Sequence, residues 1–460
     1  MPSSVLAGLL KLVVTATIVI MLTAFRFMLT AFRFMLTAVR ARRRQPLEAP
    51  KPKSLTFRID DIPIDHTKEL VRNIRSVAKH DPVLRGAAAT IVHHSVAPKD
   101  KRFICATVSI TTPLSGEDLC ARLHRSGKCY PYSYTCKFDG ITPLYEDEKG
   151  ADIDVIAVTG LGGHALGSWK SRNSDEVWLR DFLPGDMPNI RVLLYGYDTT
   201  LPGSQSRQSI GDLGSAFLEQ VTAFRANDGT SRRPTILIGH SLGGLLIKEA
   251  LIRARRQRSS WDSDLSNACF GLLFFGVPNL GLRNEQLRTL VQGQPNKALI
   301  DSLLVDNDSE PSLFLKRIAD QFSESCKGHY RVVTFFERTL SPTLERSKDG
   351  RWCRTGRRSL LVTEKSATST GLVAVADEDN IPLNTDHSGL VKYNSRNQGD
   401  YLIVRERLRR LANEAKLEVP KRFAEHTRGL IKEILRSITD SITELPEPPC
   451  SGWGVLRSAC

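Results

Sequence analysis

The stretch that most constrains the fold is a short apolar run that ends in a glycine-flanked serine. Residues 235–238 (Thr-Ile-Leu-Ile) predict a buried strand, and a helix-forming run over 245–255 follows closely. Between them, Ser241 stands two residues from Gly239 and two from Gly243. So sharp a turn strains the serine backbone and leaves no room for side chains on either side. Such strings also occur in ordinary turns, but between a strand and a helix this one predicts a nucleophile at Ser241.

Strands and helices alternate from Gly150 onward. The predicted strands are 152–158, 190–195, 235–238, 270–275, 330–336 and 359–362. The predicted helices are 178–183, 210–224, 245–255, a largely helical stretch over 283–323, and 401–412. This alternation is typical of a parallel sheet with helices on both faces. It predicts an α/β-hydrolase fold over 150–412, with Ser241 after the middle strand, and a helical tail over 413–460.

Acyl chemistry at a serine also needs two N–H donors for the oxyanion. One is the backbone amide of Leu242, which opens the helix after the serine. The other is expected from the glycine-rich loop 160–163 after the first strand, most simply from Leu161. This loop lacks the P-loop lysine and the GxGxxG spacing, which argues against a nucleotide site. We expect neither a metal ion nor an organic cofactor.

The general base is expected late in the chain, after the last strand. His387 fits, because residues 381–393 are a loop that leads into a helical stretch. Imidazole suits the role because its pKa of about 6.5 allows it to take and return a proton near neutrality. The other histidines lie in the turn itself, in the glycine loop, in the N-terminal domain, before a strand or in the tail.

The chain order Ser, acid, His places the acid between Ser241 and His387. Glu337 directly follows the predicted strand 330–336 and is the first candidate; a surface ion pair with Arg338 is the competing interpretation. Glu364, just after the predicted strand 359–362, is the alternative acid. The remaining acidic residues of this region are expected to be solvated loop charges: Asp377, Glu378, Asp379 and Asp386.

Length, charge and cysteine content narrow the class of protein. With 460 residues, of which 41% are hydrophobic and 25% charged, the chain is typical of a globular protein of two or three domains. The net charge of +14 is concentrated near the N-terminus and over 346–358, which favours an anionic membrane over nucleic acid. The nine cysteines form no C-x-x-C pair, which argues against a zinc site or a disulfide framework and favours a reducing compartment.

Residues 1–45 form a hydrophobic segment with regularly spaced arginines. Three seven-residue repeats over 21–41 place Arg26, Arg33 and Arg40 on one face of a helix, because seven residues make almost two turns. Most of the charge follows the apolar run, which is the reverse of a secretory signal peptide. The pattern predicts a signal-anchor with the bulk of the protein in the cytosol, or an Arg-rich organellar presequence. A duplicated helix without a targeting role is the third interpretation.

A Pro-rich linker over 46–53 precedes a small domain over 54–140. Its predicted elements are strand 54–60, helix 65–79, strand 89–96, strand 103–111, helix 115–125 and strand 130–138. This order predicts a ferredoxin-like α+β domain. RNA-recognition domains share the order, but residues 101–110 lack the glycine and the alternating aromatic residues that stack on bases. We therefore expect a structural or partner-docking role, and no nucleic acid.

Several motifs, in order, resemble the serine-active-site-containing lipase-like hydrolases, which are close to the phosphatidylinositol-glycan inositol deacylases. The motifs are residues 158–164, 178–184, 195–198, 239–244, 273–278 and 386–387. The resemblance covers roughly residues 150–412 and implies hydrolysis of esters of lipids or similar acyl groups, with a membrane role at the endoplasmic reticulum or mitochondria. The family usually reads His-Gly-Leu-Gly-Gly where this chain has Thr159 in place of the histidine, which implies the loss of one side-chain contact in the pocket.

Together these observations predict a membrane-associated serine esterase or lipase, in which Ser241 attacks, His387 relays the proton and a carboxylate orients the imidazole. The expected partners are a lipid or acyl-ester substrate, a membrane surface of the mitochondrion or endoplasmic reticulum, and a protein bound by residues 54–140. The alternative is a non-hydrolytic scaffold or signalling module that keeps the hydrolase fold.

Overall fold

The computed structural model describes residues 53–443, apart from gaps at 87–89, 127–131, 257–259, 306–309, 348, 350–351 and 372–376, together with part of 21–35. Residues 1–53 and 54–460 are two separate units. The predicted anchor over 1–45 and the linker over 46–53 therefore lie largely outside the described residues. Among the residues that are described, no helix is both long and apolar enough to cross a bilayer.

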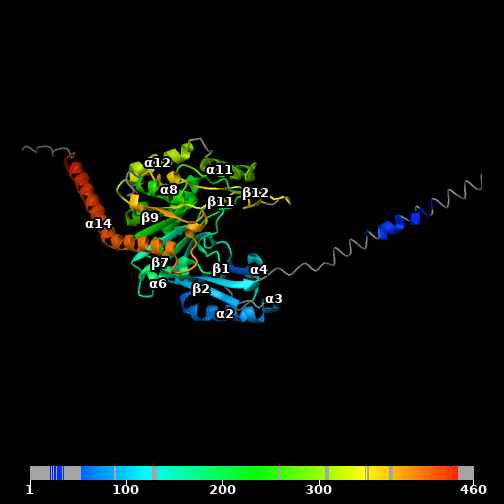
Figure 1. The fold of residues 1–460 in the computed structure, drawn as a ribbon. Coiled ribbons are helices and arrows are strands. Elements are labelled where there is room, and N and C mark those ends of the chain that lie inside the picture. The colour runs from blue at the N-terminus through cyan, green and yellow to red at the C-terminus, as the bar shows by residue number, and fades with distance from the viewer. Residues whose placement is uncertain are drawn as a thin grey trace, which may run out of the picture. The chain divides into compact units, whose positions relative to one another are not determined.

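Seven strands form the central sheet, in the order β15-β10-β9-β8-β6-β7-β5. They are β5 (Gly140–Glu146), β6 (Ile153–Val158), β7 (Ile190–Gly196), β8 (Thr235–His240), β9 (Cys269–Phe275), β10 (Arg331–Glu337) and β15 (Asn380–Leu383). Figure 1 labels two of them, β7 and β9. All neighbours pair in parallel except β5, which runs antiparallel to β7. This is the strand order of the α/β-hydrolase fold, and β8, which leads to Ser241, is the middle strand, as predicted.

Helices cover both faces of this sheet. The helices that follow β5 in the chain are α5 (Trp178–Asp181), α6 (Leu183–Asp186), α7 (Ile210–Asn227), α8 (Leu242–Arg256), α9 (Ser260–Ala268), α10 (Gln286–Leu290), α11 (Lys297–Leu303), α12 (Leu313–Cys326), α13 (Glu364–Thr368) and α14 (Gly399–Thr443). Successive strand residues point to opposite faces: Ile236 and Ile238 pack with α5 and α14, whereas Leu237 packs with α7, α8 and α12. Burial on both faces explains why these strands are apolar without alternation.

Both edge strands of the sheet differ from the prediction. The segments of β5 and β15 were not predicted as strands, because each contains a proline, Pro143 or Pro382, which disfavours a central strand. At an edge, proline is tolerated because one side of the strand needs no ladder partner; in β5 the register also shifts just after Pro143. The hydrolase sheet thus begins at Gly140, ten residues before the predicted start at 150.

The predicted strand 359–362 is wrong as a strand of the central sheet. Only Arg358–Ser359 (β14) is extended, and it pairs antiparallel with β11 (Ser341–Pro342) beside a second short hairpin of β12 (Glu345–Arg346) and β13 (Trp352–Cys353). Leu361 and Val362 are apolar because they pack in a separate cluster above the sheet, with Leu282 and Leu290. The apolar content of residues 359–362 does not by itself distinguish a strand of the central sheet from a segment that packs in this separate cluster.

The last helix is longer than predicted. Helix α14 extends from Gly399 to Thr443, although the pattern predicted an end at 412. Beyond that point Ala415, Val419 and Phe423 are still buried in the main core. Part of the predicted tail over 413–460 is therefore a continuous helix that packs on the sheet.

The segment before β5 forms a four-stranded sheet in the order β2-β3-β1-β4. Its elements are β1 (Lys53–Pro63), α2 (Thr67–His80), α3 (Pro82–Gly86), β2 (Thr90–Pro98), β3 (Phe103–Thr112), α4 (Gly116–Arg125) and β4 (Ser133–Thr135). Residues from α2 and α4 share one core with the sheet. The other face contacts the rest of the chain: Arg58 Nη1 donates to Asp139 O at 2.9 Å and to Thr142 Oγ1 at 2.8 Å. Because β3 is buried on both faces, it offers no open face for stacking bases.

Four 3-10 helices complete the described elements: η1 (Ile64–His66), η2 (Gly167–Trp169), η3 (Asp377–Asp379) and η4 (Gly389–Val391).

Candidate active site

Ser241 lies in the sharp turn between β8 and α8. Its φ of 53° is left-handed, one of three such values at non-glycine residues in the described chain. The Ser241 amide donates to Phe275 O at 2.9 Å and the Gly244 amide donates to Ser241 O at 3.1 Å, which holds this conformation. The strain expected from the motif is therefore present, as is typical of a nucleophile elbow.

The glycines of the motif are needed for close packing. A Cβ at Gly239 would lie 2.6 Å from the Gly244 Cα, and one at Gly243 would lie 2.4 Å from the Val158 carbonyl oxygen. Both contacts are with backbone atoms, which cannot move aside. The close approach lets the start of α8 pack directly on the end of β6.

The glycine-rich loop after β6 lies beside the serine. A Cβ at Gly160 would be 2.8 Å from the Ser241 Cβ, so the Gly160–Leu161 peptide borders the nucleophile. Within the described chain, no protein group accepts a hydrogen bond from the amides of Leu161 or Leu242, so both N–H groups are available. A hydrogen bond fixes the position of this loop, because Thr199 Oγ1 donates to Gly163 O at 2.6 Å.

Thr159, where the sequence departs from the pattern of the resembled family, lies beneath this loop. Its side chain is fully buried and hydrogen-bonds to Ser168 Oγ at 2.5 Å. Tyr197 Oη donates to the Thr159 carbonyl at 2.9 Å. Thr159 is not among the residues that line the pocket, so its side chain supports the loop rather than contacting a ligand.

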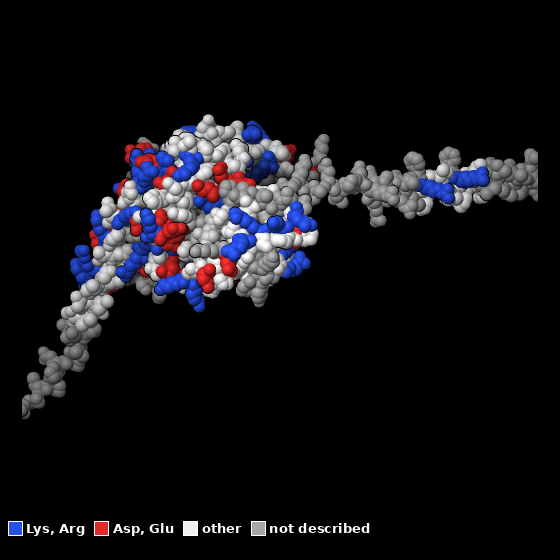
Figure 2. Space-filling view, turned by 90° about the horizontal axis from the view of Figure 1, so that it is seen from below, with Lys and Arg blue, Asp and Glu red and all other residues white. Residues whose placement is uncertain are grey.

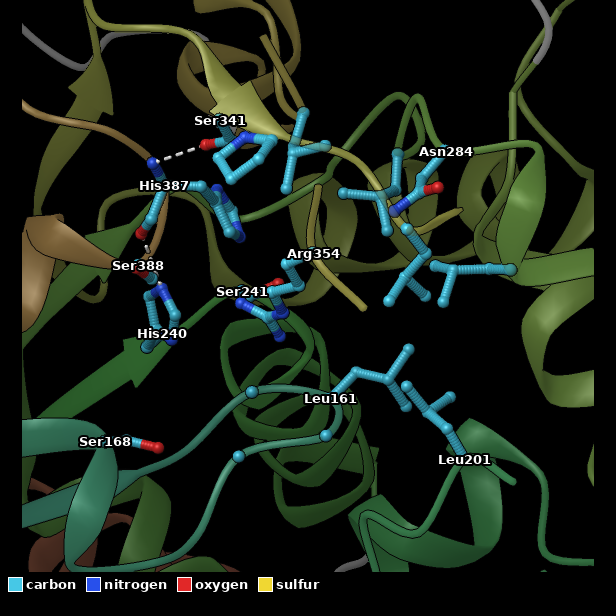
Figure 3. A pocket seen from close by; sticks show the side chains of 18 of the residues that line it. Leu161, Ser168, Leu201, His240, Ser241, Asn284, Ser341, Arg354, His387 and Ser388 are labelled. Atoms are coloured by element: carbon cyan, nitrogen blue, oxygen red, sulfur yellow. Dashed lines mark hydrogen bonds between the residues drawn. The ribbon is translucent and has the colours of Figure 1, made fainter. Parts of the chain in front are cut away.

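His387 follows β15 and faces the same pocket as Ser241 (Figure 3). Two polar contacts hold its backbone: the His387 amide donates to Ser341 Oγ at 2.9 Å, and His240 Nε2 donates to the His387 carbonyl at 3.0 Å. Room for the imidazole comes from Gly276, where a Cβ would lie 2.9 Å from the ring. Ser341, His240 and Gly276 lie on elements far apart in the chain, and together they fix the position of the His387 ring.

Glu337 ends β10 and is the carboxylate that the fold places beside His387. Its Oε2 lies 3.6 Å from His387 Nδ1, a separation just beyond hydrogen-bond distance. The Val362 amide donates to Oε1 at 2.9 Å, and Ser341 Oγ donates to Oε2 at 3.2 Å. Catalytic hydrogen bonds are often long before substrate binds, so this geometry is compatible with an orienting role.

Glu364, the alternative acid, lies elsewhere. It is half exposed and pairs with Arg338 at 3.0 Å. The surface ion pair considered for Glu337 and Arg338 is therefore formed by Glu364 instead. Asp386 accepts a hydrogen bond from the Gly389 amide at 2.9 Å and pairs with Arg172, so it shapes the His387 loop.

Burial shifts the pKa of both groups of the pair. It raises the pKa of Glu337 to about 7, against the hydrogen bonds from Val362 and Ser341 that lower it. Burial also lowers the pKa of His387 well below its ordinary value, and the neighbouring His240 and Arg354 act in the same direction. His387 is therefore neutral near neutral pH, the state in which imidazole accepts a proton.

The pocket around Ser241 has a volume of about 590 Å³. Figure 3 shows Leu161 and Leu201 on the side away from His387, where most of the lining is apolar. The apolar lining residues are Leu161, Leu201, Pro202, Leu282, Leu287, Leu290, Pro342, Leu344, Trp352 and Leu361. Two cationic side chains line the same pocket as Ser241: Arg354, labelled in Figure 3, and Lys392. An apolar wall with cations near the nucleophile suits an amphiphilic substrate.

Two residues of the site were not predicted from the sequence. Ser341 contacts both Glu337 and the His387 backbone, yet it has no motif around it. His240 was set aside because it lies inside the turn, but that place brings it against the His387 loop. Within the described residues, no cluster of three or more His, Cys, Asp or Glu side chains could hold a metal ion.

Comparison with known proteins gives a partial match. No family model matches the chain. Protein SERAC1 of Homo sapiens is 29% identical over 213 residues, which cover 42% of this chain and 32% of the human protein. Protein SERAC1 of Danio rerio is 33% identical over 222 residues, with coverage of 42% and 32%. The chain thus spans about a third of the length of the curated relatives that it matches. Closeness to the inositol deacylases stays a prediction.

Solved structures are more distant. The lipase BlEst2 of Bacillus licheniformis has a TM-score of 0.35 and 17% identity, and the match covers 55% of this chain and 92% of the lipase. The type II thioesterase YbtT of the yersiniabactin pathway has a TM-score of 0.32 and 15% identity, with coverage of 62% and 99%. The fold assignment depends on the strand order of the chain itself and not on these likenesses.

We predict that Glu337→Gln lowers kcat on an ester substrate by about 10³–10⁴-fold, because an amide favours the wrong imidazole tautomer and cannot stabilise the imidazolium. Glu364→Gln is the matched control, since Glu364 makes a half-exposed ion pair away from the pocket. Steady-state kinetics of both variants measure the effect, and thermal unfolding checks that each is folded. A near-normal rate in Glu337→Gln with a collapse in Glu364→Gln would move the role to Glu364.

We also predict that kcat/KM rises as the pH increases through about 7. Below that value the Glu337 carboxyl is protonated and cannot stabilise the positive charge that forms on His387. The apparent pKa belongs to the coupled pair. The measurement is a pH–rate profile with an activated ester, for wild type and Glu337→Gln. The assignment fails if both profiles rise with the same midpoint.

Proposed function

We propose that this protein is a serine hydrolase that cleaves carboxylic esters. The observation that carries the proposal is the strained Ser241 at the end of the middle strand, in one pocket with His387, whose ring faces the buried Glu337. In the proposed reaction, His387 Nε2 takes the Ser241 hydroxyl proton while Oγ attacks the ester carbonyl. The Leu161 and Leu242 amides hold the oxyanion, the alcohol leaves with the proton from His387, and water then releases the acid.

The pocket supports a lipid or another acylated molecule as substrate. Its leucine-rich wall suits an acyl chain, and Arg354 and Lys392 bring positive charge near the reacting ester. Burial lowers the pKa of Lys392 to about 8, and its Nζ donates to Gly167 O at 2.9 Å. Arg354 is exposed and, within the described chain, has no acidic partner.

The alternative is a scaffold or signalling module that keeps the fold without hydrolysis. The left-handed Ser241 in one pocket with His387 favours the enzyme, because a scaffold has no need of a strained serine beside a histidine. Thr159 does not favour the scaffold, since its side chain lies below the loop and outside the pocket.

Membrane association at a mitochondrion or the endoplasmic reticulum, with the hydrolase domain facing the cytosol, is the second part of the proposal. It rests on the Arg-rich apolar repeats of 1–45 and on exposed arginines near the pocket. Arg346, Arg357 and Arg358 are exposed in the segment that also carries Arg354. On the face in Figure 2, basic and acidic side chains are interspersed.

The domain assignment is also proposed: a ferredoxin-like module over 54–140 and a hydrolase domain after it. The strand order of the four-stranded sheet supports this module, and its contacts through Arg58 support a role in bracing the hydrolase part. A protein partner for this module stays a prediction.

We predict that a fluorophosphonate probe labels the wild-type protein at Ser241 and that Ser241→Ala abolishes labelling. The probe reacts with a serine only when a base activates it, so His387→Ala should lose labelling as well. Ser215→Ala, on α7 with its Oγ bonded to Gly211 O, is the control that keeps labelling. Gel fluorescence and peptide mapping measure the outcome. No labelling of the folded wild type, or equal labelling of Ser241→Ala, would favour the scaffold.

We predict that deletion of residues 1–45 releases the hydrolase from membranes into the soluble fraction, with labelling of Ser241 retained. The physical reason is that these repeats contribute the broad apolar surface that inserts into lipid. Fractionation of cells that express the full chain or the truncated protein measures this. If the truncated protein still sediments with membranes, the anchor hypothesis is wrong, and charge reversal of Arg357 and Arg358 tests the basic segment instead.

A further inference from the structure

Two cysteines at the border of the four-stranded sheet lie in direct contact. The Sγ of Cys120, on α4, is 3.3 Å from the Sγ of Cys136, which follows β4. Both are free thiols. Cys136 is packed firmly, since a Cβ at Gly116 would lie 2.7 Å from its sulfur. The two cysteines are 16 positions apart in the sequence, so no short sequence motif predicts that they lie in contact.

The two thiols differ in burial, and the contact between them lowers the pKa of one. Cys120 is buried, whereas Cys136 is partly exposed. The hydrogen bond from the Cys120 thiol lowers the pKa of Cys136, which increases its thiolate fraction. A partly exposed thiolate next to a second, buried thiol is the arrangement of a redox-sensitive cysteine with its resolving partner.

We propose that Cys120 and Cys136 form a reversible disulfide when the protein meets a peroxide. The Cys136 thiolate attacks one peroxide oxygen, the O–O bond breaks, and a Cys136 sulfenic acid and hydroxide form; the hydroxide takes up the proton that the Cys136 thiol had released and becomes the first water. The Cys120 sulfur then attacks the Cys136 sulfur, the S–O bond breaks, and a second water leaves with the Cys120 proton. Two thiols are thereby oxidised and one peroxide is reduced. A thiol reductant reverses the reaction through a mixed disulfide.

The disulfide site is connected to the candidate active site. His164 Nε2 donates to the Cys136 carbonyl at 3.1 Å, and the His164 ring lies edge-on to Phe138 at 5.0 Å. His164 Nδ1 accepts a hydrogen bond from the Leu166 amide at 3.2 Å. His164 directly follows the glycine-rich loop 160–163, which carries the Leu161 amide. Drawing Cys136 toward α4 weakens the hydrogen bond from His164 and loosens that loop. This coupling, unlike the disulfide itself, rests on the proposed function, and it predicts a loss of kcat on oxidation.

The test uses the full-length protein, treated with hydrogen peroxide or left reduced, then alkylated and digested without reductant. We expect a peptide linked through Cys120 and Cys136 in the oxidised sample, which a thiol reductant removes. Cys120→Ser and Cys136→Ser should abolish the link. Cys353→Ser, which removes another partly exposed thiol, and Cys129→Ser, whose residue lies outside the described chain, should retain it. No link, or a link through Cys129, overturns the disulfide.

Activity is the separate second readout. We expect oxidised wild type to lose kcat with recovery after reduction, and Cys120→Ser to be insensitive to peroxide. If the link forms and kcat does not change, the coupling through His164 is overturned. If the link forms and no ester is hydrolysed in either redox state, the proposed function fails while the disulfide stands.

Discussion

The left-handed backbone of Ser241 is the constraint on which the rest of the site depends. A non-glycine residue in this conformation costs on the order of 1–3 kcal/mol, so the surrounding structure must hold it. The restraint is steric: because Gly239 and Gly243 have no side chains, β8, α8 and the end of β6 can pack closely around the serine. The serine is also on the middle strand, where neighbours on both sides restrict movement. The result is a fixed position for the proposed nucleophile, beside the Leu161 and Leu242 amides, which have no acceptor within the described chain; this is the preorganisation that acyl transfer needs.

The proposed acid and base, Glu337 and His387, are held in a different way, by polar contacts between distant segments. Ser341 bonds both the Glu337 carboxylate and the His387 amide, so one hydroxyl sets the relation between the two groups. Removal from water reverses the usual order of their pKa values, because burial raises that of the carboxyl to about 7 and lowers that of the imidazole well below its ordinary value. At neutral pH the imidazole is therefore neutral and the carboxyl only partly ionised, which limits the cost of burying charge in the resting pair. The glycine loop is braced from yet another segment, through His164 and Cys136.

Much of this could be predicted from the sequence because the determinants are local. The run from Thr235 through the glycine-flanked Ser241 to α8 encodes strand, turn and helix within a few residues. The continuous apolar strands predict a sheet buried on both faces. Chain order predicts His387 as the base, and the position of Glu337 directly after the strand 330–336 ranks it above Glu364. The edge strands β5 and β15 were missed, because Pro143 and Pro382 oppose strand formation unless one side is left unpaired, and only the assembled sheet decides which side that is.

The sequence by itself determined the fold class and the residue types of the site, because periodicity, glycine spacing and order along the chain are local or one-dimensional properties. Only the tertiary structure decided which carboxylate faces the imidazole: it brings Glu337 within 3.6 Å and leaves Glu364 in an ion pair with Arg338. It alone also created the contact between Cys120 and Cys136 and the apolar wall of the pocket. These features join residues far apart in the chain, so they exist only after the sheet and its connections have packed.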